Sequence, residues 1–271
     1  MSPDTQAPRV AVVTGAGGTG CGRTIARRLA ADGAAVVVSD INDSGGRETA
    51  RLIAQAGGRA AFCHADVGDE RQARELVTFG ERTFGRVTIL VNNASAQLQP
   101  GAPLDHWTDA VQTDLLGAMF CTRAAIDAMR RGGGGAIVNI ASISALWHGR
   151  KTPGGGIAYD VAKAGVIRLT TRLAGLAGSD SIRVNCLAPG WIDTEGPRQY
   201  WESLTADERR ERGVPSRLLT TDQIADAVVR LATDETLTGR VMLWWSEDAP
   251  RIIRWGDRGY EEYEEFIPPG R

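Results

Sequence analysis

Short apolar segments alternate with amphipathic helical patterns along most of the chain, and this alternation restricts the fold more than any other feature. The apolar segments, which we predict to be strands, are 10–14, 35–40, 60–65, 87–91, 136–141, 181–187 and 240–245. Helical patterns cover 23–32, 48–56, 69–84, about 104–131, 157–177 and 221–233. Nearly continuous apolar segments indicate strands buried on both faces, and strand–helix–strand repetition indicates parallel pairing. The sequence predicts one α/β domain over 1–271, with a doubly wound parallel sheet and helices on both faces.

Charge and cysteine usage exclude several classes of partner. The chain has 31 Lys and Arg against 33 Asp and Glu, without the basic stripe of a nucleic-acid or membrane-surface protein. No apolar run is long enough to span a membrane, and the N-terminus does not resemble a signal peptide. Cys21, Cys63, Cys121 and Cys186 are far apart and lack metal-ligand spacing. We therefore expect a cytoplasmic protein without a metal site, a nucleic-acid partner or a membrane partner.

A glycine-rich turn follows the first predicted strand and precedes the first predicted helix. It contains Gly15, Gly17, Gly18, Gly20 and Gly22. Glycines allow the backbone to approach a pyrophosphate, and the helix N-terminus supplies N–H groups and partial positive charge. A glycine-rich turn alone is weak evidence, but this position in the chain strengthens the prediction of a dinucleotide site.

Asp40 ends the second predicted strand, 20 residues after Gly20. A carboxylate there accepts hydrogen bonds from the adenosine ribose hydroxyls and repels a 2′-phosphate. The alternative is an aspartate that merely begins the next loop. With the glycine-rich turn in place, we favour the ribose role and predict NAD rather than NADP.

Tyr159 and Lys163 are four residues apart on a predicted helix and share a face. A nearby ammonium favours the phenolate and lowers the pKa of a tyrosine, which allows proton transfer near neutral pH. The sequence contains only Lys151 and Lys163 as lysines, so a chance pairing is improbable. The alternative is an ordinary surface pair. We predict that Tyr159 carries the proton between the protein and a substrate oxygen.

Several motifs in their order along the chain resemble the classical short-chain dehydrogenases/reductases, from about residue 11 to 239. The matching segments are the glycine-rich turn, Asp66-Val67, Asn92-Asn93-Ala94-Ser95, Ser142, Tyr159 with Lys163, and Pro189-Gly190 with Thr194. The resemblance implies a Rossmann-like fold and hydride transfer between a secondary alcohol or ketone and a nicotinamide. It also implies a homo-oligomer, either a tetramer or a dimer.

The resemblance also implies the roles of individual residues. Ser142 would hold the substrate oxygen, Tyr159 would act as general acid or base, and Lys163 would support Tyr159 and bind the nicotinamide ribose. The expected cofactor-binding residues are Gly15, Thr19, Gly20, Cys21, Asp40, Ile41, Asp66, Val67, Asn93, Ala94, Tyr159, Lys163, Pro189, Gly190, Ile192 and Thr194.

The sequence departs from the family pattern at several points. The glycine-rich turn is one residue longer than usual, and Ser95 replaces a glycine. Asp114 stands where the family has an asparagine that links the lysine to a proton relay through water. Asp114 either keeps this relay and adds negative charge near Lys163, or is a structural helix residue. Ser142 and Tyr159 are 17 residues apart, a long gap that predicts a loop over 148–156, and Ser144 is an alternative serine.

Aromatic residues mark the expected substrate region and the C-terminal tail. Trp147, Trp191 and Trp201 either line a pocket for a cyclic or apolar substrate or belong to the core. We expect 194–212 to be a mobile lid, with a solvated helix face over 207–212. The tail, 246–271, is expected to be ordered against a neighbouring subunit or the active site, since it contains Trp255, Tyr260, Tyr263 and Phe266.

The leading hypothesis is an NAD-dependent secondary-alcohol dehydrogenase or ketone reductase. Three alternatives remain: a 3-oxoacyl reductase, a non-redox dehydratase or epimerase with a tightly held cofactor, and a nucleotide-sensing scaffold. Asp40 disfavours the first because such reductases usually prefer NADPH. Tyr159 and Lys163 disfavour the last because such proteins have usually lost one of them.

Overall fold

A computed structural model describes residues 9–96, 107–146 and 156–253 of the chain. Within these ranges one sheet has the strand order β3-β2-β1-β4-β5-β6-β7-β8. The strands are β1 (Val10–Thr14), β2 (Ala35–Asp40), β3 (Arg59–His64), β4 (Ile89–Asn92), β5 (Gly135–Ile140), β6 (Ile182–Pro189), β7 (Val241–Trp244) and β8 (Arg251–Ile252). The neighbours from β3 to β7 pair in parallel, which confirms the predicted doubly wound sheet. The short β8, within the predicted tail, adds an antiparallel edge.

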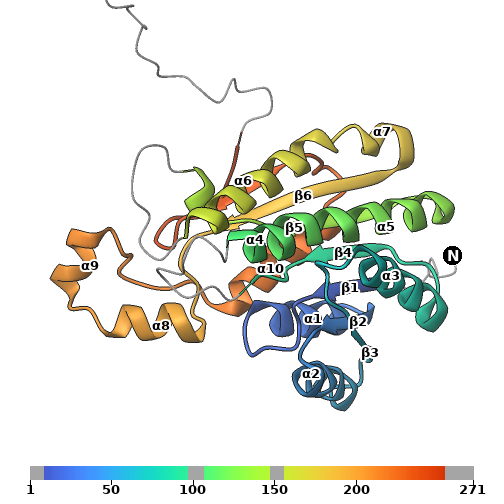
Figure 1. Cartoon of the computed structure of the whole chain (residues 1–271), viewed down its shortest axis with the longest axis horizontal. Coiled ribbons are helices and arrows are strands. Elements are labelled where there is room, and N and C mark those ends of the chain that lie inside the picture. The colour runs from blue at the N-terminus through green and yellow to red at the C-terminus, as the bar shows by residue number, and fades with distance from the viewer. Residues whose placement is uncertain (1–8, 97–106, 147–155, 254–271) are drawn as a thin grey trace, which may run out of the picture.

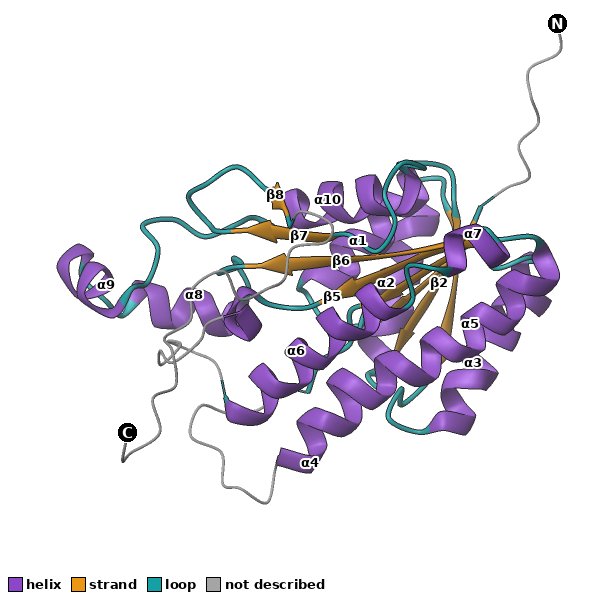
Figure 2. Cartoon of the chain, turned by 90° about the horizontal axis from the view of Figure 1, so that it is seen from above, coloured by secondary structure: helices purple, strands orange, loops and turns teal. Residues whose placement is uncertain are grey.

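Helices cover both faces of the sheet (Figures 1 and 2). Among the described residues they are α1 (Cys21–Ala31), α2 (Asp43–Gln55), α3 (Glu70–Phe84), α4 (Trp107–Ala110), α5 (Ala118–Gly132), α6 (Ile157–Arg172), α7 (Leu176–Asp180), α8 (Glu195–Glu202), α9 (Ala206–Arg212) and α10 (Thr221–Thr233). A π-helical segment, Val111–Gly117, joins α4 to α5, and a 3₁₀ turn, Ile143–Leu146, follows β5. Helices α1, α2 and α10 pack on one face, and α3 and α5 on the other.

Apolar side chains from β1 and β2 alternate between the two faces of the sheet. Val36 and Val38 belong to the cluster under α1 and α10, whereas Val37 belongs to the cluster under α3 and α5. The prediction that every strand is buried on both faces is wrong for β3, which is partly exposed along its length. Its position at the edge of the sheet explains this exposure.

The helices differ from the prediction in several places. Helix α2 begins at Asp43 rather than near Glu48, because the Asn42 side chain caps it by accepting the N–H of Gly45. The pattern over 157–177 divides after Arg172 into α6 and α7. Helix α8 was not predicted, whereas α9 coincides with the charged stretch expected to be a helix face. Figure 1 shows both helices beyond the end of β6, away from the sheet.

The carboxyl ends of the parallel strands meet at one edge of the sheet, and the predicted site residues follow these ends. The strand order reverses between β1 and β4, which is where ligands bind in open sheets of this kind. None of the described helices combines the length and the apolar character needed to cross a membrane.

Candidate active site

The glycine-rich turn brings the start of α1 close to the end of β1. Gly15 has a φ of +66°, and a Cβ on Gly22 would lie only 2.1 Å from the Gly15 carbonyl oxygen. Gly20 is the N-cap of α1, and it provides no capping side chain; the first turn also has no acidic residue. The N–H groups and the positive end of the helix dipole are therefore available to an anion, which fits a pyrophosphate.

Asp40 is held by both of its carboxylate oxygens. Oδ2 accepts the backbone N–H of Gly17 at 2.7 Å, and Oδ1 accepts the N–H of Asn42 at 2.9 Å. These bonds fix the carboxylate between the glycine-rich turn and the end of β2, while each oxygen retains a lone pair for a ribose hydroxyl. The next residue, Ile41, is 66% exposed. An exposed isoleucine at this place fits contact with a flat adenine ring.

Asn93 and Ala94 join the end of β4 to the glycine-rich turn. The Asn93 side chain donates to the carbonyl oxygens of Thr14 and Gly15, at 2.9 and 3.1 Å. The Thr14 hydroxyl accepts the N–H groups of Asn93 and Ala94. The two turns therefore form one rim. In this rim the Asn93 side chain is occupied in holding the backbone.

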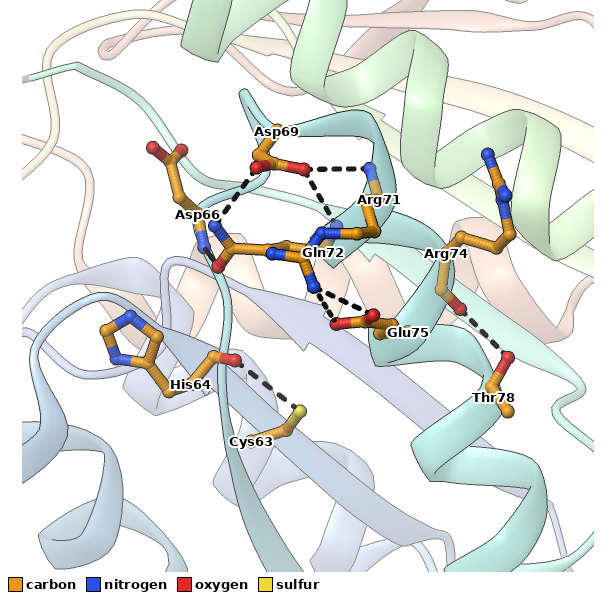
Figure 3. A network of polar contacts seen from close by, with 9 residues as sticks. All are labelled: Cys63, His64, Asp66, Asp69, Arg71, Gln72, Arg74, Glu75 and Thr78. Atoms are coloured by element: carbon orange, nitrogen blue, oxygen red, sulfur yellow. Dashed lines mark hydrogen bonds and ion pairs between the residues drawn. The ribbon is translucent and has the colours of Figure 1, made fainter.

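Asp66 and Val67 follow β3 and precede α3. Val67 is buried and packs against Gly117. A Cβ on Gly117 would lie 2.7 Å from a methyl group of Val67. The Asp66 N–H donates to the Gln72 side chain, while Asp69 caps α3 by accepting the N–H of Gln72. Figure 3 shows the exposed Asp66 carboxylate pointing away from this network. The turn is thus held by its neighbours and leaves Asp66 accessible.

Ser142 and Tyr159 lie together although 17 residues separate them. The Ser142 hydroxyl accepts hydrogen bonds from the N–H and hydroxyl of Ser144, at 3.2 and 3.0 Å, and it lies close enough to Tyr159 to lower the pKa of the phenol. Ser144 therefore orients Ser142. Burial raises the pKa of the Tyr159 phenol above its usual value, while Lys163 and the Ser142 hydrogen bond oppose the rise. Lys163 acts in the predicted direction, but the prediction that this pKa is lowered overall is wrong.

Lys163 lies one helical turn after Tyr159. Its Nζ is 5.3 Å from the centre of the Tyr159 ring, donates to the Ile140 carbonyl at 3.2 Å and lies 3.4 Å from Asp114 Oδ2. The side chains of Lys163 and Asp114 are only 4% and 0% exposed. Burial lowers the pKa of Lys163, but the negative charge of Asp114, with Tyr159, outweighs it and raises the pKa. Lys163 is therefore an ammonium at neutral pH.

Asp114 lies in the π-helical segment, and both of its carboxylate oxygens have partners. Oδ2 accepts the hydroxyl of Ser95 at 2.7 Å, and Oδ1 accepts the N–H of Ala96 at 2.6 Å. A cavity of about 10 Å³, room for one water, is lined by Asp114, Lys163 and Asn92 among others. Of the two readings of Asp114, this geometry favours the one that places negative charge beside Lys163. The two departures from the family pattern, Ser95 and Asp114, thus contact each other.

The predicted Pro189 ends β6, and the loop after it carries Gly190, Ile192 and Thr194. Ile192 pairs with Leu219, and Thr194 is the N-cap of α8. A Cβ on Gly20 would lie 3.4 Å from the Thr194 methyl group, so this loop meets the glycine-rich turn.

Ser246, which sequence analysis missed, fixes the same loop. Its hydroxyl accepts the N–H of Trp191 at 3.0 Å and lies 3.3 Å from the Trp191 carbonyl oxygen. The Gly190 N–H donates to the Trp244 carbonyl at 2.8 Å. No local motif marks this serine, because its partner is 55 residues away in the chain.

The tryptophans of the substrate region divide between two surroundings. The Trp191 ring stacks on Tyr200, with centroids 5.7 Å apart and planes 19° apart. Trp201 instead donates from Nε1 to the Pro215 carbonyl and lies 3.6 Å under the Arg209 guanidinium. Trp201 therefore holds α8 and α9 together, whereas Trp191 is adjacent to the predicted substrate region. Trp147, residues 148–155 and the tail beyond residue 253 lie outside the described residues.

Cys21 was predicted to bind the cofactor, and no metal site was expected. Cys21 is the first residue of α1, and burial raises the pKa of its thiol to about 11, so it is present there as a neutral thiol. No group of three His, Cys, Asp or Glu side chains in the described ranges could hold a metal ion.

Comparison with known proteins identifies the class of this fold and site. Residues 15–243 match the family model described as enoyl-(acyl carrier protein) reductase. This model covers most of the chain, and the relatives below carry dehydrogenase and reductase names. The chain therefore belongs to the classical short-chain dehydrogenases/reductases, and it is an oxidoreductase of that family.

Two curated relatives and one solved structure show how similar the chain is to individual members of the family. The cis-4-hydroxycyclohexanecarboxylate dehydrogenase of Sinomonas cyclohexanicum is 38% identical over 84% of this chain and 90% of its own length. The short chain dehydrogenase/reductase astE of Aspergillus oryzae is 37% identical over 83% of this chain and 88% of its own. A solved structure from Sinorhizobium meliloti, described as a candidate short-chain alcohol dehydrogenase, is 32% identical with a TM-score of 0.74, over 87% and 94% of the two chains.

Proposed function

We propose that the protein interconverts a secondary alcohol and a ketone with NAD(H), and that Tyr159 carries the proton. The observation that carries this proposal is the arrangement of three side chains. Ser142 lies close enough to Tyr159 to lower the pKa of the phenol, and the Lys163 ammonium lies 5.3 Å from the Tyr159 ring, at the strand edge that also holds Asp40 and the glycine-rich turn.

Each side chain has a defined role in the proposed reaction. A bound nicotinamide cofactor supplies the hydride chemistry. Ser142 donates a hydrogen bond to the substrate oxygen, oriented by Ser144, and stabilises the charge that develops there. In reduction Tyr159 gives its proton to that oxygen, and in oxidation it accepts one. Asp114 acts as a positioning residue, because it keeps Lys163 charged and in place beside Tyr159.

The pKa of Tyr159 supports a pH dependence of opposite sign in the two directions. Because burial raises this pKa, the phenol is protonated at neutral pH in the free protein and is ready to act as an acid. Ketone reduction should therefore fall as the pH rises through this pKa, whereas alcohol oxidation should increase with pH. Initial rates in both directions from pH 6 to 10.5 will test this.

NAD rather than NADP is supported by the fixed position of Asp40. Its carboxylate is held by Gly17 and Asn42, and a 2′-phosphate placed against it would meet negative charge. The prediction of NAD has a direct measurement, the dissociation constants of NADH and NADPH. Tighter binding of NADPH would contradict it and would favour the alternative, a 3-oxoacyl reductase.

A ring-containing alcohol is the substrate class we favour. Trp191 in the loop after β6 stacks on Tyr200 of α8, and aromatic surfaces suit cyclic substrates. The relative from Sinomonas cyclohexanicum, by its name, acts on a hydroxylated cyclohexane. A panel of cyclohexanones and aryl ketones, compared with linear ketones of equal carbon number, will test this preference.

The deciding experiment compares the native protein with Tyr159→Phe. The variant should lose at least about a hundredfold in kcat, since general acid–base catalysis contributes roughly 10²–10⁴-fold. Its affinity for NADH should remain within a few-fold, which serves as the control for folding. Full turnover by Tyr159→Phe would refute the assignment. Family membership also favours a dimer or tetramer, which light scattering of the purified protein will test.

A further inference from the structure

Arg23 joins three separate segments near the adenosine end of the proposed cofactor site. It lies in the first turn of α1. Its Nε donates to the Thr49 hydroxyl at 2.9 Å, and Nη2 donates to the carbonyl oxygens of Gly17 and Gly45 at 3.3 and 3.4 Å. One guanidinium therefore links α1, the glycine-rich turn and the first turn of α2.

Thr49 completes this arrangement from the side of α2. Its side chain is fully buried, and its hydroxyl accepts from Arg23. The same hydroxyl lies 2.8 Å from the Ala16 carbonyl oxygen and 3.0 Å from the Gly45 carbonyl oxygen, so its single proton is shared between the glycine-rich turn and the first turn of α2. A buried hydroxyl without these partners would carry a free-energy cost, so the pairing fixes α2 against the turn.

The backbone contact between the turn and α2 is too close for side chains. A Cβ on Gly45 would lie 1.9 Å from the Gly17 carbonyl oxygen, and a Cβ on Gly17 would lie 2.7 Å from Cγ of Asp40. Both backbone polar groups of Gly17 are therefore held by side chains. Arg23 binds its carbonyl oxygen, and Asp40 accepts its N–H.

We propose that Arg23 and Thr49 form a clamp of positioning residues that fixes Gly17 against Asp40 and so sets the preference for NAD over NADP. The proposal rests on the proposed cofactor site. NADP would require Asp40 to move away from the added phosphate. The clamp opposes this movement, because Asp40 would lose the N–H of a Gly17 that is itself immobile. Weakening the clamp should therefore reduce the discrimination between the two cofactors as well as the affinity for NADH.

Matched variants test the clamp without knowledge of the substrate. Thr49→Val keeps the shape of the side chain but removes the hydroxyl, whereas Thr49→Ser keeps the hydroxyl. Arg23→Met removes the donors, and Arg23→Lys retains charge without the three-way geometry. Arg27→Met, an exposed arginine on the same helix, is the control. The dissociation constants of NADH and NADPH are measured for each by nicotinamide fluorescence.

We expect Thr49→Val and Arg23→Met to weaken NADH about tenfold, the effect of one or two lost hydrogen bonds. NADPH should weaken less, so that the ratio of its dissociation constant to that of NADH falls at least about threefold. Thr49→Ser and Arg27→Met should keep the native ratio, and Arg23→Lys should fall between. Amide hydrogen exchange at Gly17 should be faster in Thr49→Val, a readout that remains informative if Arg23→Met folds poorly.

An unchanged ratio, with both cofactors weakened equally, would overturn the proposal and would indicate that Arg23 contacts the phosphates or only supports the fold. Unchanged exchange at Gly17 in Thr49→Val would overturn it as well. Failure of the native protein to bind either cofactor would instead refute the proposed function, so the two failures are distinguishable.

Discussion

Asp114→Asn should destabilise the protein even though asparagine is the usual residue of the family at this position. In the native structure the carboxylate lies 3.4 Å from Lys163 Nζ, with both side chains almost wholly buried. At an effective dielectric constant of about 20, this separation corresponds to roughly 5 kcal/mol of attraction before desolvation is counted. Asparagine removes that attraction and turns an amide towards a buried ammonium. Breaking a buried pair typically costs about 3–5 kcal/mol, and we expect the lower end because Lys163 can lose its proton.

The stability of Asp114→Asn should change with pH in the opposite direction to that of the native protein. In the native protein the pKa of Lys163 is raised, so its contribution to stability is present at neutral pH and is lost only as the pH rises through that pKa. Without Asp114, burial lowers the pKa of Lys163 below its usual value. A depressed lysine pKa favours the folded state at high pH and penalises it as the pH falls. Asp114→Asn should therefore gain stability between pH 7 and 10, while the native protein should not.

Chemical denaturation of the cofactor-free protein at fixed protein concentration measures both effects. The double variant Asp114→Asn/Lys163→Met, which leaves no uncompensated buried charge, should recover much of the loss. Asp226→Asn is the matched control. It breaks a shorter but exposed ion pair with Arg28, at 2.8 Å, and should cost under about 1 kcal/mol. A change below about 0.5 kcal/mol for Asp114→Asn at every pH would refute the reasoning.

Three further predictions concern the cofactor rim. Gly22→Ala should abolish NADH binding and lower the thermal unfolding midpoint, because the new Cβ would lie 2.1 Å from the Gly15 carbonyl oxygen. Gly18→Ala is the control and should bind NADH normally in the same titration, because its Cβ would lie 3.9 Å from the nearest atom. Cys21 should react slowly with iodoacetamide at pH 8, and faster towards pH 11, since burial raises the pKa of its thiol to about 11; rapid labelling at pH 8 by mass spectrometry would contradict this. Ser246→Ala should weaken NADH binding about fivefold, which corresponds to roughly 1 kcal/mol for a lost hydrogen bond. Unchanged affinity would mean that the loop after β6 keeps its conformation without the hydrogen bond between Ser246 and Trp191.

Local patterns in the sequence were sufficient to predict most of the sheet. Both ends of β1 and β2 match the prediction, because continuous apolar residues there are bounded by a glycine-rich turn and by Asp40. The exposure of β3 could not be predicted, because it depends on which strand stands at the edge of the sheet. Helix α8 was missed because the segment is short and contains Gly196 and Pro197, residues that are typical of turns.

The candidate site shows a similar division between local and long-range features. The motifs predicted that Ser142, Tyr159 and Lys163 lie together, and the structure brings them to one strand edge, since each follows directly from a strand end or a helical repeat. The sequence did not reveal that Ser95 donates to Asp114, although both had been noted as departures. It also gave the wrong net direction for the pKa of Tyr159, because the effect of burial depends on the packed structure rather than on the neighbouring lysine alone.

The hydrogen bonds of Ser246 give the end of the chain a direct part in shaping the loop after β6. Arg217 extends this attachment by donating to the carbonyl oxygens of Ser246 and Glu247. For protein engineering, the segment between β7 and β8 therefore belongs with the active-site loops rather than with the dispensable surface. An affinity tag inserted there, or a truncation before residue 246, would alter ligand binding without touching a catalytic motif. Libraries aimed at new substrates should vary this segment together with the loop that it holds.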